Sequence, residues 1–164
     1  MATAKKYTKL GSDLALTRYV GEASAVSLER ADSWGTLDVQ VVPGRSGGPR
    51  RKVEGHDLGV VSGRSNLAQA LILRLLTRVG ELAPLGHPDY GSRLTQLIGG
   101  LNNDTNRNLA RLYTIEAIAH EPRCKLIDLS VISVDGQPNT LRIGFSVLRI
   151  DDDDPLALAL DVTL

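Results

Sequence analysis

Three stretches in the C-terminal part of the sequence alternate between apolar and polar residues. In the first, Ile127, Leu129 and Val131 alternate with Asp128 and Ser130. The apolar positions of the other two are Leu141, Ile143, Phe145 and Val147, and then Leu156, Leu158, Leu160, Val162 and Leu164. A period of two predicts strands with one buried face, and residues 135–139 and 151–155 predict turns between them. We therefore expect an antiparallel β-meander with one apolar face.

A helical period precedes this meander. Residues 66–79 carry apolar residues at helical spacing, with Ser65 or Asn66 as the predicted N-cap and Gly80 as the stop. Apolar residues cover nearly the whole circumference and leave a narrow polar stripe, formed by Gln69, Arg74, Thr77 and Arg78. Such a helix is buried on more than one side. In a domain this small, we expect a partner chain to cover its second side.

Two more helices are predicted before the meander. The shorter one follows Ser92, and the longer one runs from Thr105 to about His120, where Pro122 ends it because proline lacks a backbone N–H. The predicted inner stripe of the longer helix consists of Leu109, Leu112, Tyr113 and Ala117, flanked by Ile115 and Ile118. Together these patterns predict an α+β fold in a single domain, with two to three helices packed on an antiparallel β-meander and an irregular N-terminal insertion.

The N-terminal part has weaker signals. Short strands are predicted around residues 14–20 and 37–41. Residues 43–52 hold two prolines, three glycines and four positive charges, a composition that predicts a mobile basic loop. We therefore divide the chain into an N-terminal arm or strand (1–20), an inserted basic Gly/Pro-rich segment (21–57) and an α+β domain (58–164).

Composition narrows the possible partners. The chain has 164 residues, with 19 Lys and Arg against 19 Asp and Glu. Zero net charge argues against general binding of nucleic acid or membrane surfaces, which relies on a basic excess. The four Tyr, one Trp and one Phe offer few platforms for stacking. No apolar run is long enough to span a bilayer or serve as a signal peptide, so we expect a soluble protein of a reducing compartment.

Motifs for catalysis or metal binding are missing from the sequence. It contains no HExxH, CxxC, GxSxG or Walker A pattern. The three histidines, His56, His87 and His120, lie in different predicted elements, and Cys124 is expected to be a small buried residue. The acidic run 151–154 lacks the glycine and glutamate of an EF-hand, so a solvated turn is expected. We therefore expect no catalytic residue, no metal, no cofactor and no enzymatic activity.

One cluster, Glu121-Pro122-Arg123, stands at the predicted junction between helix and strand. Arginine offers a planar fork of donors that suits recognition of carboxylates or carbonyls. Alternatively, Pro122 merely stops the helix and both charges are solvated. The residues alone leave both interpretations open.

Several short motifs, taken in order, resemble the baseplate wedge proteins of contractile phage tails and injection systems, the family that initiates sheath assembly. They comprise Gly11-Ser12-Asp13-Leu14, residues 63–71 and 76–81, and the Pro88-Asp89-Tyr90-Gly91-Ser92-Arg93-Leu94 stretch, which is similar to a Pro-x-Tyr/Phe-Gly pattern of the family. Glu121-Pro122-Arg123 matches the signature tripeptide of the family, and an aliphatic strand closes the chain. The resemblance covers about residues 58–164 well and 8–20 loosely.

The resemblance implies a structural role. In that family the tripeptide holds a bundle of helices from neighbouring wedge subunits, so Glu121 and Arg123 are expected to pair across subunits while Pro122 sets the junction. The meander is expected to receive extension strands from the first sheath ring by strand addition, at the apolar strands 141–147 and 156–162. The implied partners are the sheath protein, other baseplate wedge proteins and inner-tube or hub components, with six copies of this chain around the tail tube.

The implied location is the cytoplasm during assembly and then a phage tail-like particle, without contact to nucleic acid and without membrane insertion. Residues 21–57 depart from the family pattern and resemble an insertion. The alternative is a small soluble regulatory or adaptor module that uses the same fold to bind one partner.

Overall fold

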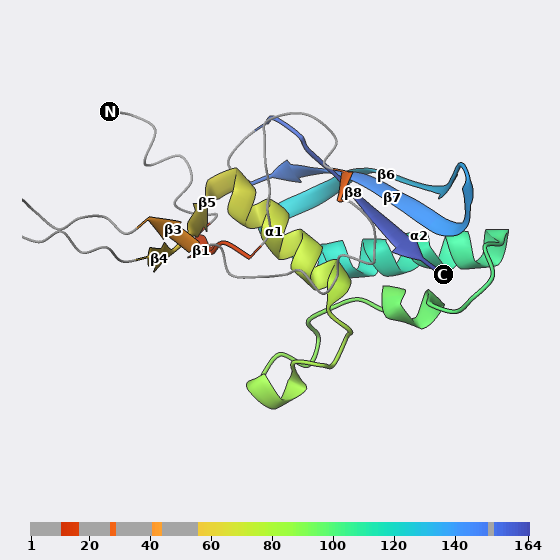
Figure 1. Ribbon diagram of the computed structural model, residues 1–164, viewed down its shortest axis with the longest axis horizontal. Coiled ribbons are helices and arrows are strands. Elements are labelled where there is room, and N and C mark those ends of the chain that lie inside the picture. Colours follow the sequence, from red (N-terminus) through yellow and green to blue (C-terminus); the bar gives the residue numbers. More distant parts are fainter. Residues whose placement is uncertain (1–10, 17–26, 29–40, 44–55, 151–152) are drawn as a thin grey trace, which may run out of the picture.

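The computed structural model describes residues 11–16, 27–28, 41–43, 56–150 and 153–164. Its N-terminal elements are β1 (Ser12–Leu14), β2 (Ser27–Leu28), β3 (Val41–Pro43), β4 (His56–Leu58), β5 (Val60–Ser62) and helix α1 (Gly63–Leu76). The 3-10 helices η3 (Ala83–Leu85) and η4 (Leu94–Leu97), helix α2 (Asp104–Ala119) and strands β6 (Cys124–Val134), β7 (Gln137–Arg149) and β8 (Leu156–Thr163) follow. The predicted α+β class, with helices on an antiparallel meander, is confirmed (Figure 1).

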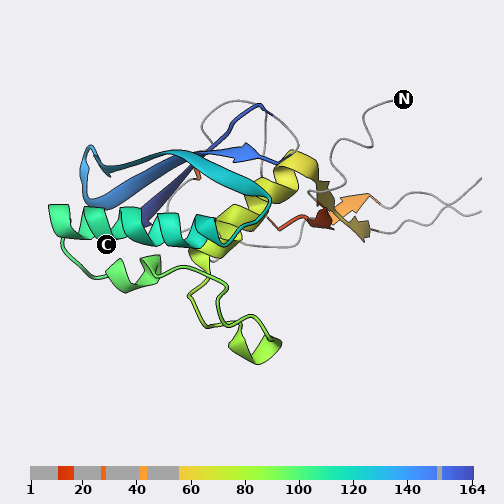
Figure 2. The ribbon, with the colours of Figure 1, turned by 180° about the vertical axis from the view of Figure 1, so that it is seen from behind.

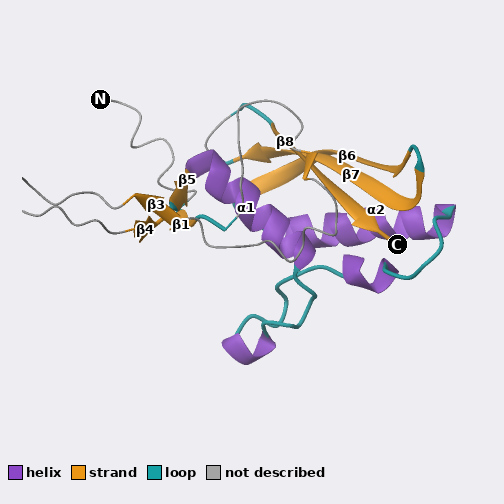
Figure 3. Ribbon diagram, in the orientation of Figure 1, coloured by secondary structure: helices purple, strands orange, loops and turns teal. Residues whose placement is uncertain are grey.

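The main sheet has the strand order β2-β8-β7-β6 (Figure 3). Strands β6, β7 and β8 form the antiparallel meander, and β2 lies parallel to β8 through Ser27 and Leu28. The register places Val131 opposite Ile143 and Ile143 opposite Leu160, so the apolar residues of the three strands form continuous rows on one face. Two small sheets, β1-β5 and β3-β4, lie at the N-terminal end of α1.

Helices α1 and α2 cover the apolar face of the sheet (Figure 2). The core is aliphatic except for Cys124 and Phe145, and its sheet side consists of the alternating residues of the meander. Those of β7 and β8 are buried without exception: Leu141, Ile143, Phe145, Val147, Leu156, Leu158, Leu160 and Val162.

Helix α1 is buried on two sides by other segments of this chain, and additional cover by a partner chain stays a prediction. Leu67, Leu71 and Leu75 lie in the main core. Gln69, predicted to be on a polar stripe, is 1% exposed, because its amide holds the segment after β1. Its Nε2 donates to the Leu14 carbonyl (2.8 Å) and its Oε1 accepts from the Leu16 N–H (2.8 Å). These two hydrogen bonds hold the backbone of residues 14–16 as a neighbouring strand would. Because the side chain of Gln69 is buried, the prediction of an exposed polar stripe is wrong at this position.

The helix ends also differ from the prediction. Helix α1 begins after Ser62 and stops at Leu76, because residues 77–79 extend and pair with Ser92: the Ser92 N–H donates to the Thr77 carbonyl (2.8 Å), and the Val79 N–H donates to the Ser92 carbonyl (3.0 Å). Helix α2 is capped by Asn103, whose side chain accepts from the Asn106 N–H (2.8 Å), and not by Thr105.

The buried stripe of α2 is narrower than predicted. Ala110, Thr114, Ala117 and Ile118 are buried. Leu112, predicted on the inner stripe, and Ile115, predicted beside it, are 47% and 46% exposed. The small side chains of Ala110, Thr114 and Ala117 let α2 approach the sheet closely. The larger side chains of Leu112 and Ile115 lie outside this contact.

Two predictions about the meander also need correction. The register of β6 shifts between Leu126 and Asp128, so Ile127 is an extra residue whose side chain is 54% exposed rather than buried. A β-bulge of this kind interrupts the alternation of the faces. The turn between β6 and β7 is shorter than 135–139, because β7 already begins at Gln137.

Much of the predicted N-terminal organisation, including most of segments 1–20 and 21–57 and the basic loop after Pro43, lies outside the described residues. Within them, β1 and β3 overlap the predicted strand regions only at Leu14 and Val41, and β4 and β5 are strands that the sequence pattern does not predict. No helix in the described parts of the chain is long and apolar enough to cross a membrane.

Candidate functional site

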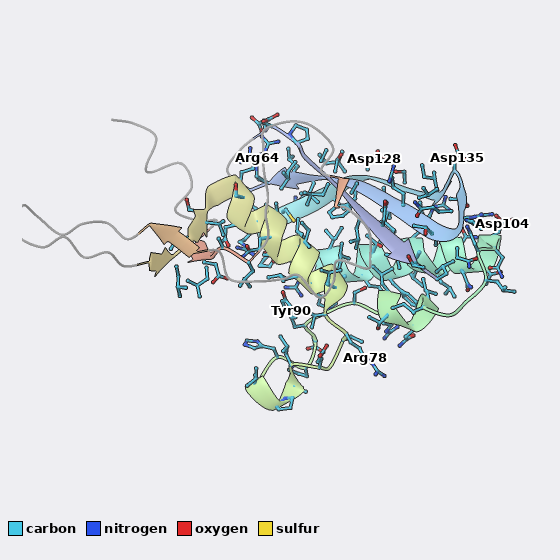
Figure 4. The ribbon with its side chains drawn as sticks, viewed as in Figure 1. Arg64, Arg78, Tyr90, Asp104, Asp128 and Asp135 are labelled. Atoms are coloured by element: carbon cyan, nitrogen blue, oxygen red, sulfur yellow. The ribbon has the colours of Figure 1, made fainter. Side chains whose placement is uncertain are left out.

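Three segments that are separated in the sequence meet at the C-terminal end of α1. Arg74 comes from the last turn of this helix, Tyr90 from the following loop, and Glu121 and Arg123 from the junction between α2 and β6. We call these four residues the motif cluster. Figure 4 shows Tyr90 below the end of α1, on the side of the molecule away from the sheet.

The carboxylate of Glu121 is the centre of the motif cluster. Its side chain is 4% exposed, and it accepts hydrogen bonds from Arg123 Nε (2.6 Å, Oε1) and Arg123 NH2 (3.1 Å, Oε2). The backbone N–H of Arg123 also donates to Oε1 (3.3 Å), and Arg74 NH2 lies 3.6 Å from Oε2. Burial raises the pKa of Glu121, but the hydrogen bonds and charges of Arg123 and the charge of Arg74 outweigh burial and lower it below its ordinary value.

Arg74 connects this carboxylate to Tyr90. Its side chain is 11% exposed, and its guanidinium carbon lies 4.4 Å from the centroid of the Tyr90 ring. A guanidinium over an aromatic face is attracted by the ring quadrupole, and more strongly when water is excluded. Burial raises the pKa of the Tyr90 hydroxyl. The two side chains therefore fix the loop against the helix that precedes it.

Gly91 allows this loop to approach α1. Its φ is +115°, and a Cβ at this position would lie 2.7 Å from the carbonyl carbon of Arg78 and from the carbonyl oxygen of Thr77. Only glycine fits here, since both the backbone angle and the space exclude a side chain. The glycine of the Pro88-Asp89-Tyr90-Gly91 stretch thus serves the pairing of Thr77 and Val79 with Ser92.

The structure changes the interpretation of the tripeptide. The alternative of solvated charges is wrong for Glu121, because it is buried. Within the single chain, Glu121 and Arg123 form a bidentate pair with each other, and the expected pairing across subunits stays a prediction. Pro122 is exposed in a turn, and α2 ends before it, at Ala119.

Sequence reasoning missed Arg74 and assigned no role to Tyr90. Arg74 was placed on a polar stripe, and nothing in its local pattern indicates that an acid lies close by. The Pro88-Asp89-Tyr90-Gly91 stretch indicates a loop, but nothing in it indicates that the Tyr90 ring contacts Arg74. Cys124, next to the motif cluster, is buried as expected, and burial raises the pKa of its thiol to about 11.

The two predicted docking strands, β7 and β8, differ in whether a backbone edge is left for an added strand. Strand β7 is hydrogen-bonded to β6 on one side and to β8 on the other, so Leu141, Ile143, Phe145 and Val147 are core residues and an added strand cannot pair with them. Strand β8 is next to the edge. Among the described residues its outer side is paired only at Ala159 and Leu160, by β2. The side chains of Leu156, Leu158, Leu160 and Val162 are buried, so these four residues offer a partner only their backbone.

A pocket of about 350 Å³ lies beside the motif cluster, between the loop before η4 and the last turns of α2. Its lining residues are Val79, Asp89, Gly91, Ser92, Arg93, Tyr113, Glu116, Ala117 and His120. Within the described residues, no group of three or more His, Cys, Asp or Glu side chains is arranged to hold a metal ion. The acidic run is a turn as far as it is described, and Asp154 pairs with Arg64 at 2.7 Å.

Comparison with known proteins relates this chain to others through its fold. No protein-family model and no curated protein matches the sequence. Among solved structures, the crystal structure of a "putative tail lysozyme" from Geobacter sulfurreducens matches 61% of this chain and 89% of that one, with a TM-score of 0.53 and 22% sequence identity. At this identity the similarity shows a shared fold.

We predict that Gly91→Ala lowers the free energy of unfolding by about 3 kcal/mol or more, because a methyl group collides with the backbone at Thr77 and Arg78 in addition to the strain of a positive φ. Gly86→Ala is the matched control: its φ is +86° but no atom lies within 4 Å of the added Cβ, so about 1 kcal/mol is expected. Urea denaturation measures both. Equal losses would contradict the steric role of Gly91.

We also predict that Glu121 contributes to stability in a pH-dependent way. Its pKa in the folded chain is below the ordinary value of 4.5, so its contribution is complete above the unfolded pKa and is lost as the pH falls through the folded pKa. Urea midpoints between about pH 2 and 7 should fall less steeply on acidification for Glu121→Gln than for the wild type. An unchanged pH profile in Glu121→Gln would show that the carboxylate is not ion-paired in the folded chain.

Proposed function

We propose that this chain is a structural baseplate wedge subunit of a contractile tail or injection system, joining a helical bundle of neighbouring wedge proteins to the first sheath ring. In this role it nucleates sheath assembly and has no enzymatic activity. Its partners are the sheath protein, other wedge proteins and inner-tube or hub components, with six copies per baseplate. Assembly takes place in the cytoplasm, and the chain remains in the tail-like particle.

The convergence of the motifs carries this proposal. Two of the stretches that resemble the wedge family are separated along the chain, yet Tyr90 of one and Glu121 and Arg123 of the other meet at Arg74 of α1. The side chain of Arg123 is 24% exposed, so the motif cluster reaches the surface, where a neighbouring subunit has access to it.

The structural neighbour gives independent support, since its name associates that protein with a tail. Its name also mentions a lysozyme. Glu121, the buried carboxylate of the candidate site, is held by Arg123 and Arg74, an arrangement that suits a structural role.

The sheath attaches, in this proposal, through the outer edge of β8. An unpaired strand edge presents backbone N–H and C=O groups to an incoming strand. In the described residues, β2 pairs with only two of the eight residues of β8. The inner side of β8 is held by β7 along its whole length and its side chains are fixed in the core, so the edge is rigid.

The assembly role predicts that Arg123→Lys reduces the number of full-length sheathed particles about tenfold or more. Lysine keeps the charge but loses the planar fork that binds Glu121 through two hydrogen bonds. Electron microscopy of particles from the native source, with the variant replacing the natural gene, measures this effect. Circular dichroism of the purified variant checks that it folds.

The matched control is Arg107→Lys. The guanidinium of Arg107 also donates to two groups, Asp104 Oδ1 and Ser133 Oγ, but these contacts lie between the start of α2 and β6, at the opposite edge of the sheet from β8 and away from the motif cluster. Particle numbers should stay normal in this variant. If Arg123→Lys also assembled normal numbers of sheathed particles, the proposed role of the tripeptide would fail.

Strand addition predicts a change in hydrogen exchange at β8. Outward amides of 156–158 and 161–163 should exchange fast in the free chain and become protected at least about tenfold in the complex with the cognate sheath protein. Amides of β7 are bonded on both sides and should be protected in both states. If protection appeared only on the helices, docking through the β8 edge would be excluded.

A further inference from the structure

The pocket beside the motif cluster is lined by an apolar set and a polar set of residues, and we call the polar set the rim. Val79, the ring of Tyr113 and Ala117 supply the apolar part, and Asp89, Ser92, Arg93, Glu116 and His120 supply the polar part. At about 350 Å³ it is near the lower limit of ligand pockets, which suits one long side chain or a small molecule. It adjoins the motif cluster through the chain itself, because Asp89 and Gly91 flank Tyr90 and His120 precedes Glu121.

Hydrogen-bond acceptors dominate this rim. Asp89 and Glu116 each bring a carboxylate. His120 Nδ1 lies 2.8 Å from the backbone carbonyl of Glu116, and because a carbonyl only accepts, Nδ1 carries the proton. The pocket thus offers two carboxylates as acceptors.

The positive charge of Arg93 balances only part of the negative charge of Asp89 and Glu116. Its NH1 lies 3.6 Å from Glu116 Oε2, beyond hydrogen-bond distance, and the two side chains are 52% and 43% exposed. An exposed pair of this kind is weak and rearranges at little cost. Two carboxylates against one guanidinium leave a net negative pocket, which fits a cation that has several N–H donors.

We infer that this pocket receives an arginine side chain from a partner wedge protein. This inference rests on the proposed function and adds the chemistry of the partner. A guanidinium presents five donors in a plane and can reach several acceptors on one rim, whereas an ammonium is a point charge. The aliphatic stem of the arginine packs against Val79 and Ala117, and the ring of Tyr113 offers a face to the cation.

The test uses the purified chain with N-acetyl-arginine methylamide as the probe. Nuclear magnetic resonance should show saturable shifts at Ala117 and at the His120 ring, with a Kd on the order of millimolar. The citrulline analogue has the same shape without the charge and should bind about tenfold more weakly or not at all. The absence of saturable shifts with the arginine probe, or equal binding of citrulline, would overturn the inference.

Asp89→Asn should weaken the arginine probe about tenfold, because it removes one charge of the rim. Asp128→Asn is the matched control, since Asp128 is exposed on the sheet, far from Tyr90 in Figure 4, and should leave the binding unchanged. Equal effects of the two variants would point to a general charge effect and overturn the site.

Particle assembly then separates this inference from the proposed function. We expect Asp89→Asn to reduce sheathed particles, as Arg123→Lys does. If Asp89→Asn lost probe binding but assembled normally, the partner arginine would be refuted while the wedge role stood. If Arg123→Lys assembled normally while the probe still bound, the wedge role would fail and the pocket would remain a guanidinium site without this partner.

Discussion

The buried carboxylate of Glu121 is the constraint on which this structure depends most. A charge with 4% of its side chain exposed needs compensation inside the fold. Arg123 supplies two hydrogen bonds and Arg74 supplies a second positive charge. Breaking such a buried arrangement by removing one partner costs about 3–5 kcal/mol. Three separate segments of the chain are therefore held in one relative position: the end of α1, the loop at Tyr90 and the junction between α2 and β6.

This arrangement links the interior to the candidate interface. Arg74 is nearly buried and stacks on Tyr90, while Arg123 on the other side of the carboxylate reaches the surface. A surface arginine held by a buried acid is oriented before any partner arrives, so less conformational entropy is lost on binding. The same loop that brings Tyr90 to the motif cluster also forms one wall of the pocket. One close backbone approach at Gly91 therefore positions both features.

The apolar core contributes to the proposed function in a different way from the motif cluster. The residues of β7 and β8 predicted as docking strands are all buried, which leaves them without side-chain contacts for a partner. Their contribution is a rigid sheet whose β8 edge is mostly unpaired within the described residues. An assembly subunit that binds through backbone groups needs such rigidity, because the added strand must find its hydrogen-bonding groups already aligned. The aliphatic core and the polar motif cluster thus serve two separate contacts of one molecule.

The sequence by itself determined the elements with a strong period. The alternation in 141–147 and 156–162 specified strands with one buried face, because side chains in a strand point to opposite sides in turn. It also determined that α1 is buried on more than one side. The local pattern gave wrong predictions of burial where contacts with a distant segment determine which side chains are exposed. The bulge at Ile127 depends on the register with β7, and the exposure of Leu112 and Ile115 depends on how closely α2 packs against the sheet.

Only the tertiary structure decided which polar residues belong together. Gln69 and Arg74 look like surface residues of a helix, but one is buried against the segment after β1 and the other against Glu121 and Tyr90. Their partners lie far away in the sequence, and no local periodicity encodes such pairs. The tripeptide pointed to a site, while its pairing within one chain emerged from the fold. The physical reason is that hydrophobic burial has a period along the chain, whereas the partner of a buried charge is chosen by proximity in space.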